Sequence, residues 1–198
     1  MSHALIVIDL QNDFCPGGAL AVPGGDEIVA GINARMADAR AVVLTQDWHP
    51  AGHSSFASQH DGRAPLETIE MPYGAQVLWP DHCVQGSIGA AFHPDLQIDR
   101  AELILRKGFR AGIDSYSAFF ENDQRTPTGL EGYLRTRGIT SLDFVGLALD
   151  FCVAWSARDA ARLGIEARVL TDLCRGIDHE GSVAQALADM RAAGVTLD

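Results

Sequence analysis

Several chemically reactive side chains stand directly after short apolar segments of this 198-residue sequence. Asp9 ends the run ALIVID, Lys107 follows the run ELILR, and Cys152 comes shortly after the run SLDFVGL. In an open parallel sheet, ligands bind beyond the carboxyl ends of the strands, so side chains at those ends converge on one crevice. A carboxylate, a lysine and a cysteine that meet there form a candidate nucleophile site. The other polar residues at such run ends are Asp47, Asp150 and Asp172.

Cys152 is the strongest candidate nucleophile. It precedes a predicted helix that begins near Val153, so we expect the helix dipole and Lys107 to favour its thiolate. Asp9 is placed to accept the thiol proton. Taken alone, Cys152 could equally be a buried small apolar residue, Asp9 a helix N-cap and Lys107 a solvated side chain. Position along the chain therefore leaves the functional and the purely structural interpretations open.

A second group of residues has the spacing of metal ligands. In the segment DWH, Asp47 and His49 are residues i and i+2, which point to the same side of an extended chain and can bind one ion together. His82, in the segment WPDHC, offers a third ligand. One carboxylate with two imidazoles suits zinc, iron or manganese, and the spacing does not choose among them. The alternative is a polar loop whose histidines bind no metal. His53 is a further histidine in the same segment.

Short apolar runs alternate with helical patterns along the chain. The runs are rich in Val, Ile and Leu, which is typical of strands covered on both faces; they are Ala4–Asp9, Ala41–Thr45, Glu102–Arg106, Ser141–Leu147, Ala167–Thr171 and a short sixth at Val195–Leu197. The predicted helices are Gly25–Arg40, Thr128–Arg137, Val153–Leu163 and Ser182–Ala193. The second of these opens with Thr-Gly-Leu-Glu, the spelling of a capping box. This alternation predicts an α/β fold of three layers, with a mostly parallel central sheet flanked by helices.

The composition narrows the class of partner. Fifteen Lys and Arg against 26 Asp and Glu give a formal net charge of −11. An acidic surface repels phosphate backbones and anionic lipids, so nucleic acid and membranes are poor partners and a neutral small molecule is favoured. The sequence shows no signal peptide and no apolar run long enough to span a membrane, and its four cysteines are scattered. We therefore expect a cytoplasmic protein with free thiols.

Six ordered blocks extend over nearly the whole chain and carry a family resemblance. They read ALIVIDLQNDFCPGGALAVPGG, TQDWHPAGHSSFASQH, WPDHCVQGSIGAAFHP, RKGFRAGIDSYSAFF, GLALDFCVAWSARDA and VLTDLCRGI. In these blocks the sequence resembles the nicotinamidase/pyrazinamidase branch of the isochorismatase-like cysteine hydrolases. The resemblance implies a single hydrolase domain over residues 1–198 and the three-layer fold expected above.

The resemblance also implies roles for particular residues. It implies a catalytic triad of Asp9, Lys107 and Cys152. It implies one divalent metal ion, with zinc favoured over iron or manganese. The implied metal ligands are Asp47, His49 and His82, and membership of His53 in this set stays open.

A substrate pocket is implied as well. Its predicted contacts are Phe14, Trp79, Tyr116 and Leu147. The Leu147–Ala148 peptide is expected to be cis, and the amides of Ala148 and Cys152 are expected to form an oxyanion hole. Residues 146–153 read GLALDFCV where the family spelling is GLATDYCV, so two hydroxyl groups are absent.

The activity implied by the resemblance is hydrolysis of nicotinamide, and of pyrazinamide, through a cysteine thioester in NAD salvage. The expected partner is thus a small aromatic amide, and the oligomeric state, monomer or homo-oligomer, is left open. Two rival hypotheses remain. A metal-free relative acting on carbamoyl or ureido amides would share the triad, but the predicted ligand set argues against it. A catalytically silent module that binds a metal or a ring is the other rival, and the intact triad argues against that.

Overall fold

The central sheet has six strands, all paired in parallel, in the order β5-β2-β1-β6-β7-β8. These strands appear in a computed structural model that describes residues 2–198. Their bounds are Ser2–Ile8 for β1, Val42–Asp47 for β2, Leu103–Lys107 for β5, Ile139–Leu147 for β6, Glu166–Arg175 for β7 and Thr196–Leu197 for β8. Each predicted apolar run therefore forms a strand of one sheet.

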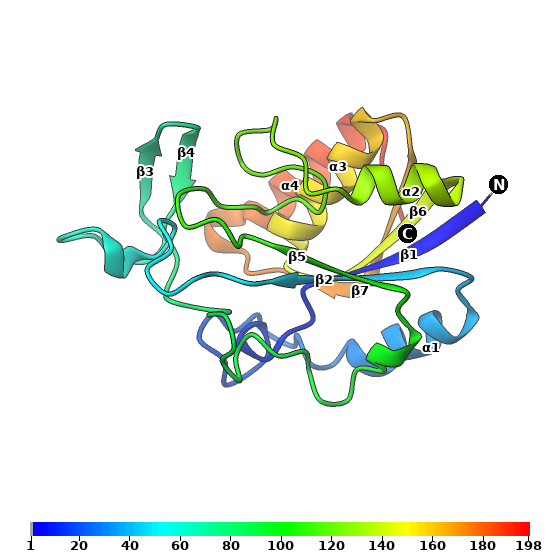
Figure 1. Ribbon diagram of the computed structural model, residues 1–198, viewed down its shortest axis with the longest axis horizontal. Helices are drawn as coiled ribbons and strands as arrows, with labels where there is room; N and C mark the ends of the chain where they lie inside the picture. The colour runs from blue at the N-terminus through cyan, green and yellow to red at the C-terminus, as the bar shows by residue number, and fades with distance from the viewer. Residues whose placement is uncertain (1) are drawn as a thin grey trace.

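Helices cover both faces of this sheet. Figure 1 shows α1 on one face and α2, α3 and α4 on the other; the bounds are Val29–Asp38, Leu130–Arg137, Ala154–Arg162 and Ser182–Ala192. Alternate side chains of β1 point to opposite faces, so Leu5 and Val7 pack on the α1 side while Ile6 and Ile8 pack on the other. The predicted three-layer α/β fold is confirmed. Between residues 2 and 198, no helix has the length and apolarity needed to cross a membrane.

Two helix starts differ from the prediction. The first helix begins at Val29 rather than Gly25, because residues 23–28 form turns and Gly24 has a φ of +67°. The capping box predicted at Thr128 is wrong. Gly129, with a φ of +105°, is the N-cap of α2. The Thr128 hydroxyl donates to the carbonyl of Ala118 and accepts from the Leu130 amide at 3.3 Å, but the Thr128 amide donates to the carbonyl of Phe119, so the return bond of a capping box is absent.

A small antiparallel hairpin was not predicted from the sequence. It consists of β3 (Thr68–Met71) and β4 (Gly74–Val77), within the long connection between β2 and β5. Figure 1 shows the hairpin standing away from the central sheet. Its strands are short and only one of their residues, Gln76, is buried, so they lack the apolar runs by which the sheet strands are recognised.

The strand order gathers the candidate residues at one edge of the sheet. Lys107 is the last residue of β5, Asp47 is the last residue of β2, and Asp9 follows β1 directly. Asp47 and Lys107 are register partners across neighbouring strands. Cys152 follows β6, which is the next strand in the sheet. Asp172 does not join this group, because β7 continues past it and its side chain is exposed.

Candidate active site

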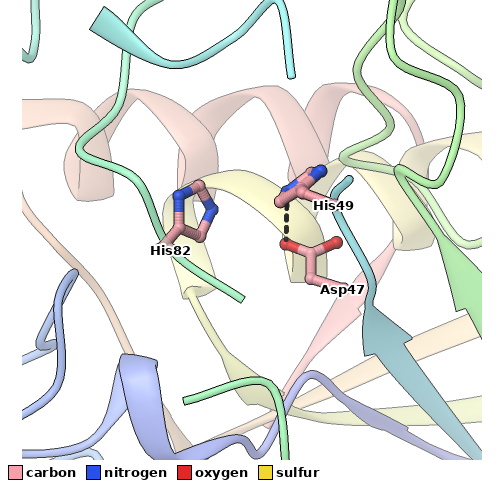
Figure 2. Close-up of side chains that lie close together, drawn as sticks. All are labelled: Asp47, His49 and His82. Carbon is pink, nitrogen blue, oxygen red and sulfur yellow. Dashed lines mark ion pairs between the residues drawn. The ribbon is translucent and has the colours of Figure 1, made fainter. Parts of the chain in front are cut away.

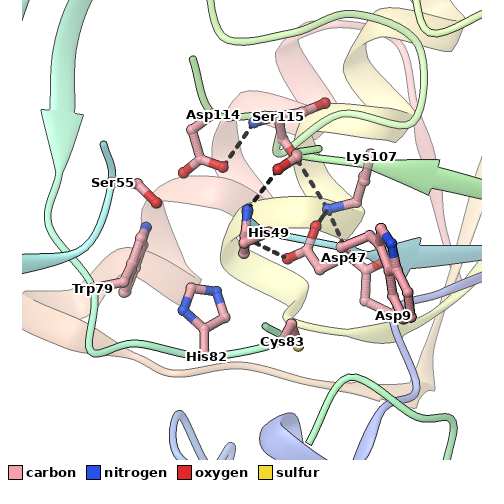
Figure 3. A network of polar contacts seen from close by, with 12 residues as sticks. Asp9, Asp47, His49, Ser55, Trp79, His82, Cys83, Lys107, Asp114 and Ser115 are labelled. Carbon is pink, nitrogen blue, oxygen red and sulfur yellow. Dashed lines mark hydrogen bonds and ion pairs between the residues drawn. The ribbon is translucent and has the colours of Figure 1, made fainter. Parts of the chain in front are cut away.

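The ammonium group of Lys107 is the centre of the polar network at this edge (Figure 3). Its Nζ lies 2.7 Å from Asp9 Oδ2, 3.4 Å from Cys152 Sγ and 3.0 Å from the carbonyl oxygen of Ser115, and it also forms an ion pair with Asp47. The side chain is fully buried. Burial opposes its charge, but attraction to Asp47 and Asp9 outweighs burial and raises the pKa of Lys107 well above its ordinary value. Lys107 is therefore a fixed cation.

Asp9 is oriented by its backbone and by Thr45. Its φ of +45° lies in the left-handed region, which turns the chain as it leaves β1. Thr45 Oγ1 donates to Asp9 Oδ1 at 2.6 Å and accepts from the Asp9 amide at 3.1 Å. Burial raises the pKa of Asp9 to about 6, although Lys107 acts in the opposite direction. An oxygen of this carboxylate lies within 4.8 Å of Cys152 Sγ, so Asp9 can exchange a proton with the thiol.

Cys152 lies in a π-helical turn, Leu149–Val153, that joins β6 to α3. Cys152 thus lies between β6 and α3, as predicted, and this wide turn precedes the α-helix. Burial raises the pKa of Cys152 well above its usual range, despite the attraction of Lys107. Lys107 lowers this pKa as expected, but burial outweighs it, so the thiol needs a base before it can attack. The Leu147–Ala148 peptide is cis, as the resemblance implies, and both Ala148 and Cys152 line the cavity described below.

Asp47, His49 and His82 face a common space (Figure 2). Their ligand atoms all lie within 4.8 Å of one another, and all three side chains are buried. His49 Nδ1 lies 2.8 Å from the carbonyl of Gly108, and His82 Nδ1 lies 2.8 Å from the carbonyl of Pro80. Each histidine therefore donates through Nδ1 and keeps the Nε2 lone pair for a metal, the usual arrangement of metal-binding histidines. The donor set fits a divalent ion.

Gly108 is needed for this arrangement. Its φ is +64°, and a Cβ atom at this position would lie 2.4 Å from Cε1 of His49. The adjacent loop is also fixed, because the His49 amide donates to the carbonyl of Cys83 at 3.0 Å. This bond holds the segment that carries His82 beside the segment that carries His49.

His53 lies beside this group, with its ring centroid 4.4 Å from that of His49. Both of its nitrogens already have partners. Nδ1 lies 2.8 Å from Ser55 Oγ, and Nε2 lies 3.1 Å from the carbonyl of Ile113. Burial and the neighbouring His49 lower the pKa of His53, which favours the neutral ring. The geometry therefore offers three free ligands rather than four.

A cavity joins the Cys152 group to the histidines. Its lining residues are Phe14, Leu20, Asp47, His49, Trp79, His82, Asp114, Tyr116, Ala148, Phe151, Cys152 and Ile177. Aromatic walls and a few polar groups are typical of sites for small flat ligands. Phe14, Trp79 and Tyr116 line the cavity as predicted. Leu147 does not, because its side chain is fully buried in the core on the α1 side of the sheet.

Several lining residues were missed by sequence reasoning. Phe151, noted only for its missing hydroxyl, packs against Trp79 with ring centroids 4.8 Å apart. Asp114 brings a further carboxylate to the wall, near His49 (Figure 3). Its one sequence signal is its place in the segment IDSYS, two residues before Tyr116. Asp150, by contrast, accepts from the amides of residues 177 and 178 and fixes the loop before α4.

Comparisons with known proteins agree with this geometry. A nicotinamidase from Acinetobacter baylyi is 54% identical over 192 residues, which cover 97% of this chain and 90% of the relative. A solved structure of a nicotinamidase/pyrazinamidase from Acinetobacter baumannii is 55% identical, with a TM-score of 0.98 over 99% of this chain and 95% of that one.

Two similar structures contain ligands. One, from Leishmania infantum, is in complex with nicotinate; it is 39% identical, with a TM-score of 0.86, and the match covers 100% of this chain and 92% of that chain. The other, a pyrazinamidase from Pyrococcus horikoshii, is in complex with zinc; it is 33% identical, with a TM-score of 0.80 over 100% and 99% of the two chains. The family model described as the Isochorismatase domain matches residues 3–197. The chain therefore belongs to the isochorismatase domain family.

Proposed function

We propose that this chain is a nicotinamidase, an amidohydrolase that converts nicotinamide to nicotinate and ammonia in NAD salvage and also accepts pyrazinamide. Its hydrolase domain would span residues 1–198. The observation that carries the proposal is the set of contacts of Lys107, which touches Cys152, Asp9 and Asp47 at once. A nucleophile, a base and a metal-binding carboxylate thus belong to one network. The names of two similar proteins support the same substrate.

Asp9, Cys152 and Lys107 would carry the acylation step. Asp9 takes the thiol proton of Cys152, and the resulting thiolate is stabilised by Lys107. The sulfur attacks the carboxamide carbon, and a C–S bond forms while the carbonyl electrons move to oxygen. The backbone amides of Ala148 and Cys152 stabilise that oxyanion. Asp9 then returns its proton to the amide nitrogen, the C–N bond breaks, and ammonia leaves a thioester on Cys152.

Asp9 would also serve the second half-reaction. After ammonia has left, its carboxylate accepts a proton from a water molecule that attacks the thioester carbon. The tetrahedral intermediate collapses, the C–S bond breaks, and the sulfur recovers a proton from Asp9. The carboxylic acid product loses its own proton to solvent. A carboxyl with a pKa near 6 can act both as base and as acid near neutral pH.

Asp47, His49 and His82 would hold a divalent ion, for which we favour zinc over iron or manganese. Two imidazoles and a carboxylate are usual zinc ligands, and a similar pyrazinamidase structure is in complex with zinc. A bound ion of this kind offers a Lewis-acidic position to a ring nitrogen or to water. His53 would stay outside the ligand set, since Ser55 and Ile113 occupy its nitrogens.

Phe14 and Trp79 would enclose the substrate ring, with Tyr116 and Phe151 completing the aromatic wall. These four rings line the same cavity as Cys152 and His49. A ring held between them would direct its carboxamide toward Cys152 and its nitrogen toward the histidines. A neutral aromatic amide also suits a chain with a net charge of −11.

Ammonia release from nicotinamide tests the proposal directly. Purified protein should hydrolyse nicotinamide and pyrazinamide, and a ureido amide of similar size should react far more slowly. Faster hydrolysis of the ureido amide would favour the metal-free relatives. No ammonia from any of these amides, with the metal loaded, would favour a silent binding module.

A further inference from the structure

Gln76 connects the β3–β4 hairpin to the wall of the cavity. It lies on β4 and its side chain is fully buried. Nε2 lies 2.9 Å from the Tyr116 hydroxyl, 3.0 Å from Asp114 Oδ2 and 2.7 Å from the carbonyl oxygen of Val77. Tyr116 and Asp114 both line the cavity, whereas Gln76 itself does not. No step of the proposed reaction uses this side chain.

The other end of the Gln76 amide determines its orientation. Oε1 accepts from the Tyr73 hydroxyl at 3.1 Å and from Asn122 Nδ2 at 3.0 Å. Because both of these groups are donors here, the oxygen must face them and the NH₂ group must face the cavity wall. Asn122 also accepts from the Tyr116 amide at 3.0 Å through Oδ1. The amide of Gln76 therefore has one stable orientation.

The network continues from Tyr116 to Trp79. The indole Nε1 donates to the Tyr116 hydroxyl at 3.1 Å, and the two rings meet edge to face with centroids 6.2 Å apart. The Tyr116 oxygen thus receives donors from Gln76 and from Trp79. An oxygen bound in this way limits the rotation of both rings, and these rings form the wall against which a flat substrate would lie.

We propose that Gln76 is a positioning residue that determines how tightly the cavity holds a flat heteroaromatic ring. It acts through Tyr116, Trp79 and Asp114 and has no contact with the reacting atoms. The inference rests on the proposed function for the identity of the ring. Its effect falls on ring binding and leaves the Cys152 chemistry unchanged, because Lys107, Asp9 and Cys152 bind one another without it.

Replacement by a residue of similar length without an amide is the direct perturbation. In Gln76→Met, two buried acceptors, Asp114 Oδ2 and the Tyr116 hydroxyl, lose a donor. We expect KM for nicotinamide to rise roughly tenfold, the range expected when buried partners are left unsatisfied, while kcat changes less than about threefold. Gln76→Glu is a second variant. It keeps the shape and the Oε1 acceptor but replaces the NH₂ group, which has two hydrogens, with a carboxyl oxygen that carries at most one, so its KM should rise in the same direction.

Gln46 provides a matched control. It is also buried and bonded through both ends of its amide, but to the Ala90 carbonyl and to Arg106 rather than to cavity groups. Gln46→Met should lower the melting temperature to a similar extent and leave KM unchanged. A purely structural role for Gln76 would make the two variants behave alike.

The decisive measurement is protection of Cys152 against iodoacetamide by nicotinamide, followed by mass spectrometry of the Cys152 peptide. Without nicotinamide, alkylation rates should agree within about threefold in the wild type, Gln76→Met, Gln76→Glu and Gln46→Met, since iodoacetamide has no ring to position. The nicotinamide concentration that halves the rate should rise roughly tenfold in the two Gln76 variants alone. In a Tyr116→Phe background, Gln76→Met should raise this nicotinamide concentration by a smaller factor than it does in the wild type.

Protection that is unchanged in both Gln76 variants, or effects of Gln76→Met and Tyr116→Phe that simply multiply, would overturn the inference. So would an alkylation rate that collapses together with protection, since that indicates a damaged nucleophile site. Protection needs no turnover. A wild type that is protected by nicotinamide but releases no ammonia would therefore refute the proposed function and still decide the role of Gln76.

Discussion

Lys107 Nζ and Cys152 Sγ lie 3.4 Å apart in a fully buried environment. The same ammonium group contacts the carboxylates of Asp9 and Asp47. Lys107 is also the single lysine of the sequence. One cation therefore balances the base, the nucleophile when it ionises, and a proposed metal ligand, and removal of this cation should affect stability and activity together.

Lys107→Met should leave two buried carboxylates without their cation. Breaking a buried ion pair by removal of one partner costs about 3–5 kcal/mol, so the free energy of unfolding should fall by roughly this amount. Turnover should also fall by about a thousandfold or more, because the thiolate loses its stabilising charge. Urea unfolding and ammonia release measure the two effects. Arg100→Met, at an exposed position in the turn before β5, is the control and should be nearly neutral. Near-native stability of Lys107→Met would contradict the assignment.

Cys152→Ala should abolish turnover and keep the fold. The side chain is small and its proposed task is nucleophilic attack, so we expect kcat to fall by at least about a thousandfold while nicotinamide still binds. Cys174→Ala is the matched control, since Cys174 is buried but lies outside the cavity. Ammonia release and calorimetric binding of nicotinamide provide the two readouts. Residual turnover near the wild-type level in a clean Cys152→Ala preparation would exclude the thioester mechanism.

The pH profile should show the titration of Asp9. Its pKa is raised to about 6 in the folded protein, and the protonated form cannot accept the thiol proton. The value of kcat/KM should therefore fall as pH decreases through about 6, and remain constant above it until other groups titrate. Because the sequence has one lysine, ¹⁵N labelling of lysine gives one side-chain signal, from Lys107, that senses Asp9.

That Lys107 signal should titrate with the same midpoint in the wild type and should lose this transition in Asp9→Asn. Metal content must be followed across the same pH range, since protonation of the histidines would also lower activity at acid pH. In the absence of metal, burial lowers the pKa of His82 to about 4, well below the expected midpoint. The pKa of His49 is raised instead, because its contacts with Asp47 outweigh its burial, so proton uptake by His49 must be separated from that of Asp9. If the midpoint of the kcat/KM profile follows metal loss rather than the Lys107 signal, the fall in activity at acid pH would be assigned to the metal site.

Metal removal should first weaken substrate binding. If the ring nitrogen faces the metal, chelation should raise the dissociation constant of nicotinamide. Benzamide, which lacks that nitrogen, should be a poor substrate of the metal-loaded protein.

His49→Ala should lose metal and activity together, whereas Cys152→Ala should keep its full metal content. His60→Ala is the control, because His60 binds the Ser54 carbonyl outside the ligand group. Elemental analysis and kinetics with both amides decide the matter; equal turnover of both amides by metal-free protein would refute the anchoring role.

The placement of Asp9, Asp47, Lys107 and Cys152 followed from the sequence because of a local rule. Apolar runs predict buried parallel strands, and parallel strands end at a common edge. The segment DWH likewise indicates two ligands on one side of the chain without knowledge of the fold. Such local patterns depend on neighbouring residues and can be recognised in a linear sequence.

Contacts between distant segments could not be predicted in the same way. Gln76 meets Asp114 and Tyr116 across 38 and 40 residues, and nothing near Gln76 in the sequence indicates either partner. The occupied nitrogens of His53 depend on Ile113, which is 60 residues away.

The sequence by itself therefore determined the layered α/β fold, the strand ends and the residue types that could perform amide hydrolysis. Tertiary structure alone decided that Leu147 turns into the core, that Phe151 faces the cavity, that burial raises the pKa of Cys152, and that Gln76 bonds to the aromatic wall. The physical reason is that burial, pKa and hydrogen-bond partners depend on which distant groups exclude water from a side chain, and only the packed chain specifies those groups.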